Sequence, residues 1–182
     1  MNDFKRSLPS WVPLAAGLAI AVLGMVLLWA LVIKSDEDAE KDGPRVVETS
    51  DLSDAAERVG HPIYWAGERS KTDLELAEAD SGRVYVRYLD EGTEAGTRST
   101  DFMTVVTYPV PNATAALRRA LKTRPDAELA RGDDGAVVLI DPSTPGSVRL
   151  AYPGSDEQVE LYTPNVRESI RLATNGSIQP VQ

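Results

Sequence analysis

An uncharged stretch of 23 residues near the amino terminus constrains this chain more than any other feature. Residues 11–33 read WVPLAAGLAIAVLGMVLLWALVI and contain no Asp, Glu, Lys, Arg or His. An α-helix needs about 20 predominantly apolar residues to cross the hydrocarbon core of a bilayer. Trp11 and Trp29 lie toward the two ends of the stretch, and indole rings settle at membrane–water interfaces. The stretch therefore predicts one transmembrane helix with Trp11 and Trp29 as its interface anchors.

A cleavable signal peptide is the alternative interpretation of residues 11–33. The apolar part of a signal peptide usually spans about 7–15 residues and ends in a small-residue cleavage site. The stretch here is longer and ends in LWALVIKSDE, which favours an uncleaved anchor. Gly17, Ala21 and Gly24 form a series of small residues that could pack against a second helix, although small residues are common in membrane helices in general.

The charges beside this stretch predict its orientation. Lys5 and Arg6 precede it, whereas the residues that follow Lys34 are dominated by Asp and Glu. Lys and Arg near a span favour the cytoplasmic side. We therefore expect a single-pass protein of the cell membrane, with residues 1–10 as a cytoplasmic tail and the carboxyl-terminal domain outside the cytoplasm. A cytoplasmic domain on the same anchor is the alternative.

Charge and composition exclude several classes of function. After Ile33 the chain has 17 Lys and Arg residues against 27 Asp and Glu residues. Proteins that bind nucleic acids neutralise phosphates with clustered basic residues, so no nucleic-acid partner is expected. The chain contains no cysteine, which excludes disulfides, cysteine-ligated zinc and a thiol nucleophile.

The remaining sequence divides into a linker, one domain and a tail. Residues 34–49 are charged and predict a flexible acidic linker. Residues 50–178 predict an α+β domain, because helical periodicity alternates there with β-hairpin patterns and turn signals. We expect a mainly antiparallel sheet with helices packed on one face, followed by a short tail at 179–182. The acidic residues Asp73, Glu75 and Glu78 are interpreted as the solvated side of a strand.

A shift of 53 residues aligns two parts of the predicted domain. Residues 74–123 and 127–176 both read as a β-hairpin, further strand sequence and a helix, and several residue types coincide. This pattern predicts two β-hairpin–strand–helix repeats. Because the middle parts do not match, coincidence is the alternative explanation.

No motif in the sequence defines a catalytic centre. Walker, Rossmann and zinc-protease patterns are absent, and GDDG at 132–135 reads as a tight turn. The single histidine, His61, lies between a glycine and a proline. The sequence indicates no nucleophile or carboxylate that would act with it, so we expect a structural role for His61. The sequence therefore predicts no cofactor, no metal and no catalytic residue.

Aromatic residues provide the candidates for a binding surface. Tyr and Trp are enriched where proteins bind partners, and Tyr64, Trp65, Tyr85 and Tyr108 lie on predicted strands or beside them. For Trp65 a core position is favoured, and a partner-binding surface is the alternative. The leading hypothesis is a non-enzymatic, membrane-tethered extracytoplasmic domain that binds a protein or cell-envelope component. A hydrolase of envelope polymers that uses paired carboxylates and a ligand-sensing domain are the alternatives.

Two short stretches resemble a known group of proteins. The chain resembles bacterial single-pass membrane proteins of uncharacterised activity in two segments. They are residues 62–67, within HPIYWAG, and residues 83–89, which read RVYVRYL. These proteins carry a small α+β domain behind one anchor. The resemblance implies an anchored extracytoplasmic domain, and it transfers no activity and no functional residue to this chain.

Overall fold

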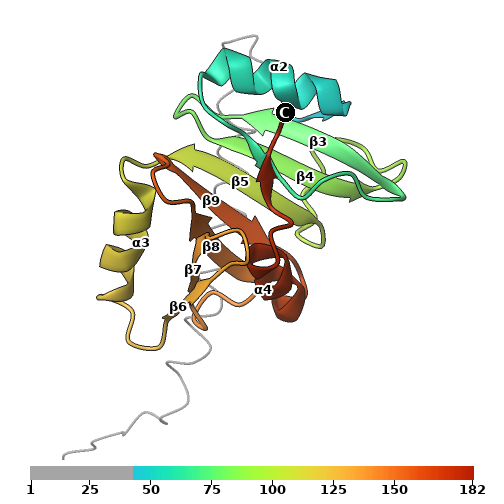
Figure 1. Cartoon of the computed structure of the whole chain (residues 1–182). Coiled ribbons are helices and arrows are strands. Elements are labelled where there is room, and N and C mark those ends of the chain that lie inside the picture. The colour runs from blue at the N-terminus through green and yellow to red at the C-terminus, as the bar shows by residue number, and fades with distance from the viewer. Residues whose placement is uncertain (1–42) are drawn as a thin grey trace, which may run out of the picture.

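The structure is a computed structural model that describes residues 43–182. Eight of the strands form one sheet in which every neighbouring pair is antiparallel. Its order is β1-β3-β4-β5-β9-β8-β7-β6 (Figure 1). The strands are β1 (Arg45–Val47), β3 (Thr72–Glu78), β4 (Val84–Asp90), β5 (Met103–Pro109), β6 (Glu128–Arg131), β7 (Val137–Ile140), β8 (Ser147–Ala151) and β9 (Glu157–Tyr162). The predicted α+β class with a mainly antiparallel sheet is confirmed.

Three helices complete the described fold. They are α2 (Thr49–Val59), α3 (Ala113–Leu121) and α4 (Val166–Thr174). The amide of Glu48 donates to the Asp51 carboxylate at the start of α2, at 2.8 Å. The side chain of Asn165 accepts a hydrogen bond from the amide of Arg167 at the start of α4. In both contacts a side-chain oxygen accepts a hydrogen bond from a backbone amide at the helix start, where amides lack a partner within the helix.

The first face of the sheet carries the main hydrophobic core. Alternate residues of each strand point to this face, and α2 and α4 cover them. Leu52 of α2 and Leu172 of α4 belong to the same core as Leu76 of β3 and Leu150 of β8.

The second face carries α3, which packs on the other side of β6, β7 and β8. Leu117 of α3 packs there with Leu139 of β7 and Ala151 of β8. Figure 1 shows α3 and α4 on opposite sides of these strands. The prediction that the helices pack on one face is therefore wrong. It failed because the side on which a helix packs depends on how the chain crosses the sheet, which local periodicity does not encode.

Each of the two predicted repeats consists of strands followed by a helix, but the first has three strands (β3, β4 and β5) and the second has four (β6, β7, β8 and β9). Helices α3 and α4 start and end 53 residues apart, as the alignment of 74–123 with 127–176 predicts. However, β8 lies between β7 and β9, whereas β4 and β5 are direct neighbours. Because the two helices also lie on opposite faces, the three-dimensional arrangement of the two segments differs. A common origin of the two segments stays a prediction.

The ordered domain extends beyond the predicted range of 50–178 at both ends. Strand β1 falls inside the predicted linker 34–49 and pairs with β3. The predicted tail 179–182 contains β10 (Gln179–Pro180), which pairs with β2 (Tyr64–Trp65) in a second, two-stranded sheet. The Ser53 hydroxyl also donates to the Gln182 carbonyl at 2.7 Å. These strands are too short to give a periodic sequence signal, and their partners are distant in sequence.

The predictions for the anchor fall outside the described residues. These are the cytoplasmic tail at 1–10, the span at 11–33, and the roles of Trp11, Trp29, Gly17, Ala21 and Gly24. Among residues 43–182, no helix has the length and apolar character that a membrane crossing requires.

Candidate functional site

The four aromatic residues predicted to bind a partner lie on two different faces. Tyr64 belongs to the first-face core, and its ring stacks on Tyr152 with centroids 5.2 Å apart. The Tyr64 amide donates to the hydroxyl of Thr107 at 2.9 Å. Trp65 is partly buried and packs against the same core. These contacts give Tyr64 and Trp65 a structural role in the described fold, which for Trp65 agrees with the favoured core position.

Tyr85 and Tyr108 lie together on the second face, at a distance from Tyr64 and Trp65. They share a small hydrophobic cluster with Val106. The sheet register extends this group across four strands, because Tyr85 of β4 lies opposite Val106 of β5 and Val106 lies opposite Glu160 of β9. Glu160 in turn lies opposite Arg149 of β8.

Polar side chains surround Tyr108 in this group. Arg83 places its guanidinium carbon 5.4 Å from the centroid of the Tyr108 ring, within the range of a cation–π contact. The amide nitrogen of Gln158 donates to the Tyr108 hydroxyl. We call Arg83, Tyr85, Tyr108, Arg149, Gln158 and Glu160 the second-face cluster.

Burial and charge both act on the Tyr108 hydroxyl. Burial raises the pKa of Tyr108 to about 12, and the Glu160 carboxylate adds to the rise, although Arg149, Gln158 and Arg83 oppose it. Burial also raises the pKa of Tyr85, against a hydrogen bond from Arg83. Both phenols are therefore neutral hydrogen-bonding groups at physiological pH.

The second-face cluster presents side chains of several chemical kinds. It combines aromatic rings, two guanidinium groups and one carboxylate, and the side chains of Arg83, Tyr108, Arg149 and Glu160 are half-buried. Helix α3 covers the β6–β8 end of this face. The buried residues of α2 and α4 belong to the first face, so among the helices of residues 43–182 only α3 borders the cluster.

A buried ion pair lies beside this cluster and was not predicted. Arg87 of β4 donates to the carboxylate of Glu75 of β3 at 2.9 Å, and both side chains are at most 5% exposed. Arg87 also donates to the carbonyls of Thr97 and Ser99, while the amide of Gly96 donates to Glu75 at 2.5 Å. The interpretation of Glu75 as solvated is therefore wrong. The loop between β4 and β5 folds over the strand and supplies the polar partners that a buried charge requires.

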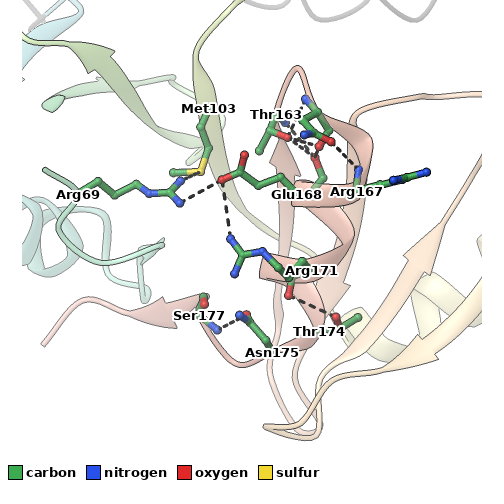
Figure 2. A network of polar contacts seen from close by, with 11 residues as sticks. Arg69, Met103, Thr163, Arg167, Glu168, Arg171, Thr174, Asn175 and Ser177 are labelled. Atoms are coloured by element: carbon green, nitrogen blue, oxygen red, sulfur yellow. Dashed lines mark hydrogen bonds and ion pairs between the residues drawn. The ribbon is translucent and has the colours of Figure 1, made fainter. Parts of the chain in front are cut away.

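Figure 2 shows a second polar network, which joins α4 to the loop between β2 and β3. Arg69 donates to the Glu168 carboxylate at 3.1 Å and to the sulfur of Met103 at 3.0 Å. Arg171 lies 3.9 Å from the same carboxylate oxygen. Because these charges are partly exposed, each pair contributes about 0–1 kcal/mol. The network holds α4 against the loop between β2 and β3, and we assign it a structural role.

The start of α4 is held by buried hydroxyl groups. The Ser169 hydroxyl donates to the carbonyl of Gly146 at 2.7 Å and accepts from the amide of Thr163 at 3.1 Å. Gly146 has a φ of +85°, and a Cβ atom there would lie 2.6 Å from the carbonyl oxygen of Thr163. Only glycine fits this close approach, so this network is structural.

His61 links two loops. Its Nε2 atom lies 2.8 Å from the carbonyl oxygen of Gly82, and its Nδ1 atom lies 3.0 Å from the carbonyl oxygen of Pro62. It therefore holds the turn between β3 and β4 in place, in agreement with the expected structural role. Among the described residues, no group of three or more His, Cys, Asp or Glu side chains is placed to hold a metal ion.

Comparisons with known proteins assign no class to this fold. A scan against protein-family models finds no match, and searches of curated proteins and of solved structures find no similar protein.

Proposed function

We propose that this protein is a non-enzymatic binding domain tethered to the cell membrane, with its folded part outside the cytoplasm. Residues 11–33 anchor the chain, and the second-face cluster contacts a protein or a component of the cell envelope. The anchor is proposed from its uncharged length. The orientation is proposed from the basic tail that precedes it.

The single observation that supports the binding role is the composition and position of the second-face cluster. Tyr and Arg side chains dominate the energetic centres of protein interfaces, and four of the six cluster residues are Tyr or Arg. They come from β4, β5 and β8 or lie beside β4, and the sheet register brings them together. A rigid sheet loses little conformational freedom when it binds a partner.

Site-specific photo-crosslinking tests the proposal. A photoreactive phenylalanine analogue replaces Tyr108 in the full chain, expressed in its own membrane. The matched control carries the same analogue at Val166, which is 42% exposed on α4 and belongs to the other face. We expect one adduct of defined mass from position 108 and none from position 166.

The cluster itself supplies a second control for this experiment. Arg149→Gln removes one charge of the cluster and should reduce the adduct from position 108 at least fivefold. Equal adducts from positions 108 and 166, or no adduct from position 108, would contradict the proposed surface.

A further inference from the structure

Basic residues are concentrated in one segment of an otherwise acidic domain. Residues 118–131 contain five Lys and Arg residues and two Asp and Glu residues. The rest of residues 43–182 contains ten Lys and Arg residues and twenty Asp and Glu residues. A segment with a formal charge of +3 therefore lies in a domain whose remaining charge is −10.

The fold places three of these cations on one side of α3. Ala115, Arg118, Arg119 and Lys122 follow each other at i, i+3, i+4 and i+7, which is the spacing of a single helix face. Arg118, Arg119 and Lys122 are exposed, and Ala115 is partly exposed. The opposite side of the helix packs on the second face of the sheet through Leu117. We call Arg118, Arg119 and Lys122 the basic face of α3.

Internal contacts do not account for the basic face. Its three side chains form no ion pair or hydrogen bond with any of residues 43–182. Arg124 differs from them, because it lies 2.9 Å from the Asp141 carboxylate and donates to the carbonyl of Ala120 at 3.2 Å. Arg124 thus already supplies a cation to the carboxyl end of α3, where the helix dipole favours positive charge.

We propose that the basic face of α3 docks the domain on anionic lipid headgroups of the membrane that anchors the chain. This inference rests on the proposed membrane tether. One Lys or Arg near an anionic membrane surface contributes about 1 kcal/mol, which corresponds to about a fivefold gain in affinity. Three such residues give about a 100-fold gain, and the tether makes docking an intramolecular event at high effective concentration.

The tether is long enough for this contact. Adjacent strands lie about 4.8 Å apart, so β1 and β6 at the two edges of the eight-stranded sheet are roughly 34 Å apart. The eleven residues from Lys34 to Pro44 can reach at most about 36–40 Å. The domain can therefore bring the basic face of α3 to the bilayer while β1 remains close to the anchor.

The acidic remainder of the domain does not prevent docking. Charges more than about 8 Å apart are largely screened at physiological ionic strength. The acidic residues Asp51, Asp54 and Glu57 belong to α2, which covers the first face at the other end of the sheet from α3 (Figure 1). Attraction at α3 and repulsion at α2 are thus separate local effects.

Quenching by spin-labelled lipids tests the proposal on the full chain. Because the chain has no cysteine, Ala115→Cys places one fluorophore on α3, beside the basic face, and Val166→Cys places a matched control on α4. The protein is reconstituted in vesicles of phosphatidylcholine alone or with 30% phosphatidylglycerol, each with headgroup spin labels. We expect quenching of the α3 label in phosphatidylglycerol vesicles only, and no difference between the two vesicles for the α4 label.

Charge variants distinguish docking by the basic face from general attraction. R118Q/R119Q should lower the ratio of docked to undocked domain about 30-fold. The matched control R98Q/R167Q removes the same charge from two other exposed arginines and should leave the ratio within twofold. High salt, near 1 M, should abolish quenching because the screening length falls to about 3 Å.

Other outcomes overturn the inference. Equal quenching of the α3 label in both vesicles, or quenching that survives high salt, would show proximity without headgroup recognition. A response of the α3 label to added polyglutamate, with none to phosphatidylglycerol, would assign the basic face to an acidic peptide. A full chain that fails to float with phosphatidylcholine vesicles would contradict the tether itself, whereas flotation without docking would contradict only this inference.

Discussion

At the scale of single residues, the Glu75–Arg87 pair is the most demanding feature of the domain. Taking two charges out of water is costly, and the pair is tolerated only because further hydrogen bonds satisfy both groups. Here the partners are backbone groups of Gly96, Thr97 and Ser99. The pair therefore fixes the loop between β4 and β5 beside the second-face cluster.

Removal of the Arg87 side chain should destabilise the domain strongly. R87M leaves the Glu75 carboxylate buried without its cation, and we expect a loss of about 3–5 kcal/mol in the free energy of unfolding. Urea denaturation of the full chain in mild detergent measures this loss. The double variant E75M/R87M removes both charges and should be more stable than R87M. Equal losses in the two variants would contradict the ion-pair account.

Asp141 makes the stability of the domain depend on pH. Burial raises the pKa of this carboxyl, but hydrogen bonds from Ser143 and the charges of Arg124 and Arg149 outweigh burial and leave the pKa below its usual value. A carboxyl with a lowered pKa in the folded state contributes stability above its unfolded pKa of about 3.9, and this contribution is lost as pH falls through the folded value.

The variant D141N tests this dependence. We expect D141N to be about 1–2 kcal/mol less stable than the parent at pH 7, and the difference should shrink as pH falls below about 4. Denaturation curves at several pH values measure it. The exposed Asp126 provides the matched control, and D126N should stay within about 0.5 kcal/mol of the parent throughout. A constant D141N difference down to pH 2 would exclude a role for the Asp141 charge.

At the scale of elements, helices and hairpins could be predicted because their signals are local. The spacing of Leu117 and the alanines around it predicts α3, and alternation through Val84 and Val86 with a Gly82 turn predicts the β3–β4 hairpin. Strands β1 and β10 could not be predicted, since they consist of two or three residues that pair with distant segments.

Deletion of residues 179–182 tests whether the last residues are part of the fold. The amide of Val181 donates to the carbonyl of Ile63 at 2.8 Å, and the Ser53 hydroxyl donates to Gln182. Each net hydrogen bond contributes about 1 kcal/mol, so with the β10–β2 pairing we expect a loss of about 2–3 kcal/mol in urea denaturation. S53A removes one bond and should lose at most about 1 kcal/mol. Unchanged stability of the deletion variant would contradict this account and would support the interpretation of residues 179–182 as a tail outside the fold.

At the scale of the whole molecule, part of the candidate site could be predicted from the sequence. Tyr85 and Tyr108 were expected, because Tyr is enriched where proteins bind partners. Gln158, Glu160 and Arg149 were not expected, because their position depends on the pairing of β5 with β9. That pairing joins residues about 50 positions apart, and nothing local in the sequence specifies its register.

The most direct test of the central claim is labelling of single cysteines in intact cells. The chain has no cysteine of its own, so Val166→Cys reports the folded domain and Asn2→Cys reports the amino-terminal tail. With a membrane-impermeant maleimide, we expect position 166 to react in intact cells and position 2 to react only after lysis. Labelling of position 2 but not 166 in intact cells, or recovery of the chain in the soluble fraction without its first residues, would contradict a membrane-tethered extracytoplasmic domain.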